Sequence, residues 1–234
     1  MARVPLVFHE QYDLHFGRHV FPSQKYRMIH ELLLRTGEAA EADFHTPVMA
    51  TDEQLRLVHD EAWINKLRKG TISYQEILQL EVPYSRQMVD AFWLSAGGTT
   101  LAGRLALAHG AAFNVGGGFH HAFPGHGEGF CAIHDVAVAI RVLQREELIR
   151  KAVVVDVDVH QGNGTAVIFA GDESVFTLSI HQLHNYPAVK PPSDLDINLE
   201  DGVGDIEYFE KMRHGLAPVL ELVAQFPMGR VLLG

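Results

Sequence analysis

The sequence predicts an α/β fold in which a parallel sheet is flanked by helices on both faces. Nearly continuous apolar segments, such as residues 151–159, alternate along the chain with longer segments whose apolar residues recur at helical spacing. Buried parallel strands have this continuous apolar character, and their alternation with helices is typical of a parallel sheet. The chain has 234 residues, of which 47% are hydrophobic, so we expect a single domain over residues 1–234 with one sizeable core.

The N-terminal half is expected to begin with a short strand that is followed by helices. Ser23 is the predicted N-cap of a helix that ends at Gly37, because serine is favoured before the first turn and glycine after the last. Thr51 is the predicted N-cap of a second helix that continues to Gly70. The other elements predicted here are a strand at residues 4–10, a long helix at residues 83–110 that Gly97 and Gly98 weaken, and a strand at residues 111–118.

The C-terminal half is expected to alternate more regularly between strands and helices. Its last predicted helix contains Pro218, which should bend or divide it because proline lacks an amide hydrogen and clashes with the preceding turn. The elements predicted here are helices at residues 135–150, 164–171 and 205–226 and strands at residues 151–159, 174–180, 195–200 and 229–234.

Composition excludes several classes of protein. The formal net charge is −10, from 19 basic and 29 acidic residues, which argues against direct binding of nucleic acid but not against a cationic substrate. One cysteine allows no internal disulfide and favours a reducing compartment. The N-terminus has no signal-peptide pattern, and no apolar run reaches membrane-spanning length, so we expect a cytoplasmic protein that does not bind a membrane.

Polar residues that could carry chemistry follow three of the predicted strands. In open parallel sheets, ligands bind beyond the carboxyl ends of the strands. The three segments are "GGGFHH" with His120 and His121, "VVVDVDVH" with Asp156, Asp158 and His160, and "FTLSIH" with Ser179 and His181.

Asp156, Asp158 and His160 alternate, so on a strand their side chains would point to one face. Two carboxylates and an imidazole that converge in this way favour a divalent cation, and this mixture of oxygen and nitrogen ligands suits a catalytic zinc site. The alternative is that one aspartate caps the following turn and that His160 is an ordinary surface residue.

The glycines before His120 and His121 let the backbone pass close to its neighbours and turn sharply. Beyond that turn, the paired histidines could act as general base and as electrostatic partner for a metal-activated water. Taken alone, the pair could instead bind a metal or reflect packing. A phosphate-binding loop does not fit, because no lysine or arginine follows nearby.

Three segments together resemble one family. "GGGFHHAFPGHGEGFCAIHD", "VVVDVDVHQGNGT" and "FTLSIH" with its following "YP" are similar to the zinc-dependent histone deacetylase and acetylpolyamine amidohydrolase family, most of all to bacterial and class IV deacetylases. The resemblance spans nearly the whole chain. It implies the arginase/deacetylase fold and hydrolysis of the amide of an acetylated lysine, polyamine or small amine by a metal-activated water.

The resemblance also implies roles for the paired histidines and the metal-binding segment. Asp158 and His160 would bind Zn²⁺, with Fe²⁺ as the other possible metal. His121 would be the general base, and His120 would hydrogen-bond the water and the developing oxyanion. Asp156 would orient His120, and Asn163 would orient His121.

Two further groups of residues take their roles from the resemblance alone. A structural K⁺ would lie among Asp156, Asp158, His160, Ser179 and Ile180, held largely by backbone carbonyls. The walls that grip the acyl-lysine stem would be Phe130 and Tyr186, with Gly129 and Cys131 beside them. His134, where relatives often have asparagine, would have a supporting or structural role rather than bind the metal.

The sequence departs from the family pattern at its C-terminal end. The third zinc ligand of the family follows a strand resembling "RVLLG", and the tyrosine that stabilises the oxyanion lies later still, whereas this chain ends at Gly234. We therefore expect a C-terminally truncated domain that lacks its final central strand and has activity near background. The alternatives to an active deacetylase are an inactive relative that binds acylated ligands and an arginase-like ureohydrolase, for which "DVDVH" lacks the further aspartates.

Overall fold

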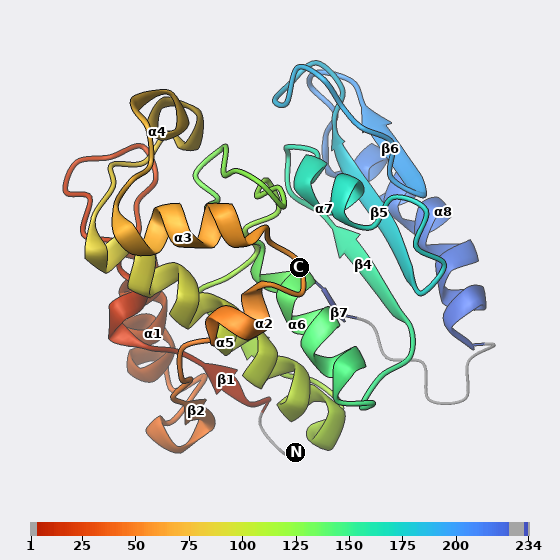
Figure 1. The fold of residues 1–234 in the computed structure, drawn as a ribbon. Coiled ribbons are helices and arrows are strands. Elements are labelled where there is room, and N and C mark those ends of the chain that lie inside the picture. The colour runs from red at the N-terminus through yellow and green to blue at the C-terminus, as the bar shows by residue number, and fades with distance from the viewer. Residues whose placement is uncertain (1–3, 225–231, 234) are drawn as a thin grey trace. The chain divides into compact units, whose positions relative to one another are not determined.

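A computed structural model of the chain describes residues 4–224 and 232–233. The chain divides into two compact units, residues 1–146 and residues 147–234, and each is described by itself (Figure 1). Every pairing between strands is parallel, which confirms the predicted α/β class with a parallel arrangement. Where one sheet was predicted, the described residues form two sheets, one in each unit.

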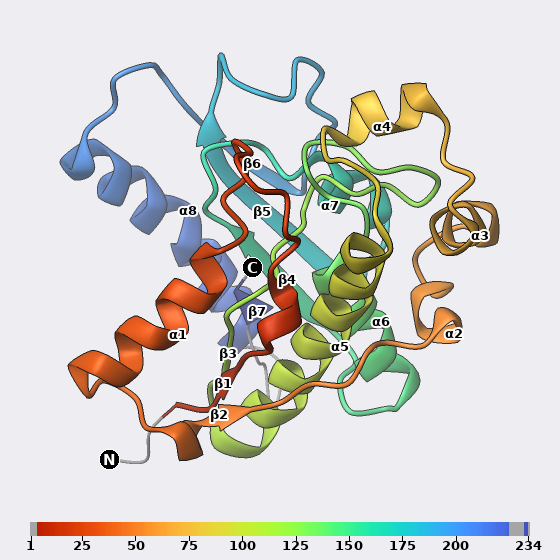
Figure 2. The same cartoon turned by 90° about the vertical axis from the view of Figure 1, so that its left-hand side faces the viewer.

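The N-terminal unit contains a sheet of three short strands in the order β2-β1-β3. Leu6 of the middle strand lies beside Phe44 on one neighbour and Phe113 on the other. Figure 2 shows α1 and α5 beside this sheet. The elements of the unit are β1 (Leu6–Val7), η1 (Glu10–Tyr12), α1 (Lys25–Thr36), η2 (Glu41–Asp43), β2 (Phe44–His45), α2 (Asp52–Leu55), α3 (Glu61–Lys69), α4 (Tyr74–Leu80), α5 (Arg86–His109), β3 (Phe113–Asn114) and α6 (Asp135–Arg145).

Of the helix ends predicted at Ser23, Gly37, Thr51 and Gly70, the last three are confirmed and the first is wrong. Gly37 ends α1 in the left-handed conformation with φ of 74°, and the Thr51 hydroxyl accepts a hydrogen bond from the Gln54 amide at the start of α2. Gln24 rather than Ser23 precedes α1, because the Ser23 hydroxyl donates to the Asp13 carboxylate instead.

The single helix predicted from Thr51 to Gly70 is wrong, since α2 ends at Leu55 and α3 begins at Glu61. The residues between them contact a distant part of the chain. The His59 ring is hydrogen-bonded to the Phe123 carbonyl, and the Asp60 amide donates to the Pro124 carbonyl. The Asp60 bond replaces the helical one that the apolar spacing predicts, whereas the His59 amide still donates to the Leu55 carbonyl as in a helix.

Gly97 and Gly98 do not interrupt α5, which continues from Arg86 to His109. A Cβ atom at Gly97 would strike the Val48 carbonyl oxygen, and one at Gly98 would strike the Tyr12 hydroxyl. Glycine is therefore required here for close packing rather than for flexibility. The main core of the unit packs around this helix and includes the large buried side chains Trp63, Phe92, Trp93 and Ile133.

The C-terminal unit contains a sheet of four strands in the order β6-β5-β4-β7. Figures 1 and 2 show α7 and α8 on opposite faces of this sheet. Within it, Asp156 at the end of β4 lies beside Ser179 of β5. The elements are β4 (Ala152–Asp156), α7 (Asn163–Ile168), β5 (Val175–Gln182), β6 (Leu195–Leu199), α8 (Asp205–Ala224) and β7 (Leu232–Leu233).

Pro218 does not divide α8, which continues from Asp205 to Ala224. The next residue, Val219, is buried and packs with Val153, Val155 and Leu178 of the sheet. Leu216, before the proline, packs against the same cluster, so the helix is held on both sides of Pro218, whose missing amide removes only one hydrogen bond. The predicted last strand is confirmed at Leu232–Leu233, which pairs with β4, while the expected absence of a further strand concerns residues beyond Gly234. None of the helices in the described ranges is long and apolar enough to span a bilayer.

Helix α4 was not predicted from the sequence, and its first turn is fixed by a capping box. The Ser73 hydroxyl accepts from the Glu76 amide, and the Glu76 carboxylate accepts from the Ser73 amide. Lys66 of α3 donates to the same carboxylate, so Glu76 also ties α4 to α3. Together with Ser73 and the nearby positive charge, this hydrogen bond lowers the pKa of Glu76 to about 2.

Replacing Glu76 by Gln should remove a pH-dependent part of the stability. The folded-state pKa lies below the ordinary value of 4.5, so the carboxylate stabilises the protein above about pH 5, and this contribution disappears as the pH falls towards 2. The difference in unfolding free energy between wild type and Glu76→Gln, measured by urea denaturation, should shrink over that range. Glu146→Gln, which breaks a more exposed pair with Arg104, should cost no more than about 1 kcal/mol. If the difference in unfolding free energy between wild type and Glu76→Gln does not change with pH, the lowered pKa of Glu76 is contradicted.

Candidate active site

The sequence-predicted site residues are divided between the two units. His120, His121, Gly129, Phe130, Cys131 and His134 belong to the N-terminal unit, whereas Asp156, Asp158, His160, Asn163, Ser179, Ile180, His181 and Tyr186 belong to the C-terminal unit. The geometry of each group is described within its own unit.

The histidine loop, residues 114–121, packs tightly on its own unit. A Cβ atom at Gly116 would strike the Tyr12 ring, and one at Gly117 would strike the Asp135 carboxylate. Gly118 has φ of +84°, a conformation that favours glycine. The prediction that these glycines allow close approach and a sharp turn is therefore confirmed.

His120 and His121 lie side by side beyond this turn. Their ring centroids are 4.0 Å apart, with an angle of 44° between the ring planes. His121 is buried, with 4% of its surface exposed, and His120 is partly exposed. The preceding Phe119 is buried, and its ring lies 4.7 Å from that of Phe92. Phe119 thus anchors the backbone of the pair in the core. The His121 ring is buried, while the His120 ring remains partly accessible.

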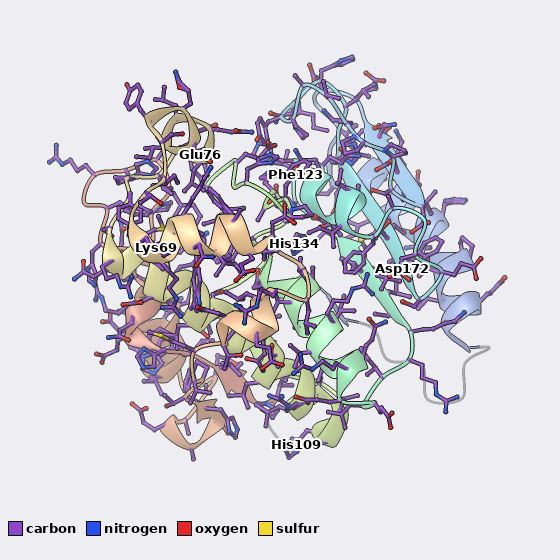
Figure 3. The ribbon with its side chains drawn as sticks, viewed as in Figure 1. Lys69, Glu76, His109, Phe123, His134 and Asp172 are labelled. Atoms are coloured by element: carbon purple, nitrogen blue, oxygen red, sulfur yellow. The ribbon has the colours of Figure 1, made fainter. Side chains whose placement is uncertain are left out.

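A second pair of buried histidines supports this region. His134 precedes α6, and its backbone amide donates to Nε2 of His59 at 3.0 Å (His134 is marked in Figure 3). Nδ1 of His134 accepts from the Ala137 amide, and Nδ1 of His59 lies 3.0 Å from the Phe123 carbonyl oxygen. These partners assign the proton of His59 to Nδ1 and leave Nδ1 of His134 unprotonated.

Both of these supporting imidazoles are neutral at pH 7. Burial lowers the pKa of His59 to about 4, an effect that its carbonyl partner only partly opposes. Burial also lowers the pKa of His134 well below its usual range, and repulsion from His59, His120 and His121 adds to this. The contacts of His134 with His59 and with the start of α6 agree with a supporting role, which stays a prediction. His59 was missed, because a histidine within an apolar helical pattern carries no local signal of its distant partners.

Phe130 belongs to an aromatic group in the N-terminal unit. Gly129 and Phe130 have φ of 53° and 69°, and the Phe130 amide donates to the Leu80 carbonyl. The Phe130 ring lies 5.7 Å from the rings of both His19 and Phe21. Cys131 is buried, and its thiol donates to the Gly129 carbonyl. The expected partner wall, Tyr186, belongs to the other unit, so the acyl-lysine slot stays a prediction.

The candidate metal ligands do not alternate along a strand, which corrects the sequence prediction. Strand β4 ends at Asp156, and Asp158 and His160 follow in bends. The Asp158 amide donates to Oδ1 of Asp156, and the His160 amide donates to Oδ1 of Asp158. Aspartate side chains often capture the backbone amide two residues on and so compete with strand pairing. The alternative reading, in which an aspartate shapes the next turn, is correct for the backbone.

The turn nevertheless brings two suitable donor atoms together. Oδ1 of Asp158 lies 3.2 Å from Nδ1 of His160. Two ligands that each lie about 2.0–2.1 Å from a tetrahedral zinc are separated by about 3.3 Å, so this pair fits one zinc ion. The Tyr186 ring packs perpendicular to the His160 ring, with centroids 5.9 Å apart. Among the residues that the structure describes, no group of three or more His, Cys, Asp or Glu side chains gathers as a metal site.

The remaining predicted residues of this unit lie on β5 and α7. The Ser179 hydroxyl is hydrogen-bonded to Nδ1 of His181, and Ile180 between them is buried. Burial lowers the pKa of His181. Asn163 begins α7, and its side-chain oxygen accepts from the Gly164 amide. Because Asp156 lies beside Ser179, two of the groups expected around K⁺ are neighbours in the sheet.

Comparison with known proteins decides the family. The chain matches the family model described as the histone deacetylase domain over residues 19–226. It belongs to the histone deacetylase family. This confirms the resemblance on which the site residues were assigned, and it places the chain among deacetylases, which are hydrolases.

Three curated relatives are longer than this chain. It is 39% identical over 220 residues to an uncharacterised protein of Picosynechococcus, covering 94% of this chain and 73% of the relative. It is 28% identical to histone deacetylase 2 of Arabidopsis thaliana, covering 92% of this chain and 59% of the relative. It is 33% identical to the acetoin utilization protein AcuC of Bacillus subtilis, covering 72% of this chain and 46% of the relative.

Solved structures confirm the deacetylase fold. The crystal structure of an HDAC homolog from Aquifex aeolicus has a TM-score of 0.78 and 25% identity, covering 99% of this chain and 68% of that one. An HDAC homolog complexed with SAHA has a TM-score of 0.76 over the same shares. The HDA15 HD domain, at 22% identity and a TM-score of 0.79 over 99% of this chain and 76% of that one, supports the fold alone. The predicted arginase/deacetylase-like fold is confirmed.

The neutral state of His59 should make the protein sensitive to mild acid. Its folded-state pKa of about 4 lies below the ordinary value of 6.5. Between pH 4 and pH 6.5, His59 is therefore protonated in the unfolded chain but not in the folded protein. Stability that is present above pH 6.5 should therefore be lost as the pH falls, by about 2 kcal/mol between pH 7 and pH 5.

The variant His59→Gln isolates this effect. Its amide can accept from His134 and donate to the Phe123 carbonyl, but it does not titrate. Urea denaturation should give a flatter pH dependence for His59→Gln than for wild type, whereas His109→Gln, at an exposed position, should keep the wild-type profile. Equal slopes for wild type and His59→Gln would show that His59 is not the group responsible.

Proposed function

We propose that the protein is a zinc-dependent deacetylase that hydrolyses the amide bond of acetyl-lysine or of an acetylated amine. The observation that carries this proposal is the histidine loop, which presents two adjacent imidazoles in a chain of the deacetylase family. General bases in such hydrolyses are most often histidines held in a buried, pre-organised position. We further propose that the two units work as one domain over residues 1–234.

Asp158 and His160 are the proposed metal ligands, for Zn²⁺ or alternatively Fe²⁺. Their donor atoms have the separation that a shared ion requires, and carboxylate and imidazole suit both metals. When bound, the metal supplies Lewis-acid polarisation of the substrate carbonyl and activation of water. A catalytic zinc has three protein ligands, so this pair supplies two of them.

The proposed chemistry of the chain itself centres on the paired histidines. His121, which is buried, accepts the proton of the attacking water, and the more accessible His120 donates a hydrogen bond to the developing oxyanion. His134 is neutral and so adds no positive charge beside the pair. Asp156 and Asn163 are the proposed orienting partners of His120 and His121.

The proposed substrate contacts are aromatic. Phe130, held by the Leu80 carbonyl and by neighbouring rings, forms one wall for the aliphatic stem of an acylated lysine or amine. Tyr186 forms the other wall, with Gly129 and Cys131 beside Phe130. The net charge of −10 agrees with a cationic amine product and not with direct binding of nucleic acid. We place the protein in the cytoplasm, without membrane binding.

A structural K⁺ is part of the same proposal. Asp156 and Ser179 are register neighbours on β4 and β5, and their side chains are buried. Oxygen atoms of Asp156, Asp158, His160, Ser179 and Ile180 are the proposed ligands.

Removing both proposed metal ligands should abolish stoichiometric metal binding. The double variant Asp158→Ala, His160→Ala loses the two donor atoms that lie 3.2 Å apart, so after dialysis against zinc its metal content should be near zero by atomic absorption. His184→Ala changes an exposed histidine of the same unit and should retain the wild-type content. Wild-type zinc content in the double variant would exclude this site.

In a catalytically active form of the protein, replacing His121 by Ala should reduce turnover of a fluorogenic acetyl-lysine substrate by about 10²–10⁴-fold, the usual contribution of a general base. Zinc content should stay normal, because His121 is not a proposed ligand. His126→Ala, outside the histidine loop, is the matched control and should retain turnover. Loss of zinc together with activity would make His121 a ligand instead. If the wild-type protein binds stoichiometric zinc but does not turn over the substrate, the alternative is favoured, an inactive relative that binds acylated ligands.

A further inference from the structure

Asp135 is a buried carboxylate that the proposed chemistry does not yet use. It is the first residue of α6, and none of its surface is exposed. The Phe119 amide donates to its Oδ1 at 2.8 Å, and the Gly118 amide lies 3.1 Å from both oxygens. The Thr99 hydroxyl donates to Oδ2. In the described residues, the donors that reach this carboxylate are thus neutral hydroxyl and amide groups.

The two amides belong to the backbone directly before the paired histidines. The Gly118 carbonyl in turn accepts from the His120 amide at 2.9 Å, so one tight turn connects the Asp135 contact to His120. Phe119 is fixed on its other side by its buried ring. The path from Asp135 to the imidazoles of His120 and His121 therefore contains no freely rotating backbone segment.

The loop also lies directly on the carboxylate. A Cβ atom at Gly117 would strike Oδ2 of Asp135 and would lie 2.8 Å from the Thr99 hydroxyl oxygen. Any side chain at Gly117 would push the loop and the carboxylate apart. The close packing of the loop on Asp135 therefore depends on glycine at position 117.

We propose that Asp135 is a positioning residue for the deacetylation reaction, in which its carboxylate fixes the Gly118–Phe119 backbone and thereby the places of His120 and His121. This inference rests on the function proposed above, because it assigns the paired histidines to the reaction.

The chemistry of the contact requires a carboxylate. Its two oxygens accept from different directions, whereas an asparagine has one acceptor oxygen. An asparagine that kept this oxygen toward the Phe119 amide would turn its own amide hydrogens toward the Gly118 amide and the Thr99 hydroxyl, which now donate to Oδ2. Burial raises the pKa of Asp135, but the hydroxyl and amide donors favour the charged form and oppose that rise. The start of a helix also favours a negative charge.

The first test is Asp135→Asn, measured by hydrogen exchange and by steady-state kinetics on the full protein. The Gly118 and Phe119 amides should exchange faster than in wild type. The kcat for an acetyl-lysine substrate should fall by about 10²-fold, because a small misplacement of reacting groups costs that much, while KM and zinc content stay unchanged. Asp172→Asn is the matched control, since it makes the same change at a carboxylate that accepts from the Ser174 amide of a surface turn.

A second variant approaches the contact from the loop side. Gly117→Ala leaves the carboxylate in place but adds a methyl group against it, and it should produce the same faster exchange and lower kcat. Gly204→Ala is its control, because a Cβ atom there has no heavy atom within 4 Å. If Asp135→Asn does not fold, hydrogen exchange and kcat measured on Gly117→Ala test the proposal instead.

The outcomes separate this inference from the proposed function. Unchanged exchange at Gly118 and Phe119 would overturn the positioning role whatever the turnover. Faster exchange with unchanged kcat in an active protein would also overturn it, since the loop would then be held without consequence for the reaction. A wild-type protein that binds zinc but has no turnover would count against the proposed function, and the exchange measurements would still decide whether Asp135 holds the loop.

Discussion

Contact between the backbone of the histidine loop and two buried side chains is the constraint on which the arrangement of the paired imidazoles depends. Gly116 lies against the Tyr12 ring and Gly117 against Asp135, at distances where no side chain fits. Tyr12 is itself pressed against Gly98 of α5. Three glycine contacts therefore join the loop, η1, α5 and α6, and a histidine attached to this framework has little freedom to move.

The ionisable side chains around the candidate site are buried in one unit and exposed in the other. In the N-terminal unit, His59 and His134 are buried and neutral, because burial disfavours the charged imidazole. In the C-terminal unit, the Asp158 and His160 side chains keep 51% and 38% of their surface exposed. The neutral imidazoles of His59 and His134 support the histidine loop without adding charge to it, whereas accessible carboxylate and imidazole atoms suit metal binding.

Local patterns predicted the elements whose causes are local. Gly37 and Thr51 mark helix ends because their conformational and capping preferences act within a few residues. His59 and the break between α2 and α3 were not predictable, since both depend on hydrogen bonds to residues more than sixty positions away. The ligand types at Asp158 and His160 were recognised from their spacing, but the strand assumed for them was wrong, because the aspartates bond to the backbone that follows them.

The hydrogen-bonded turn from Asp156 to His160 has a consequence for the proposed metal site. Each carboxylate holds the amide two residues on, so the chain shapes this turn with its own groups during folding. The entropic cost of ordering this backbone is then part of folding and not of ion binding. At the proposed site, one ion would then replace another without refolding of the segment, and the choice between metals would depend on their supply and on the preference of the donor atoms.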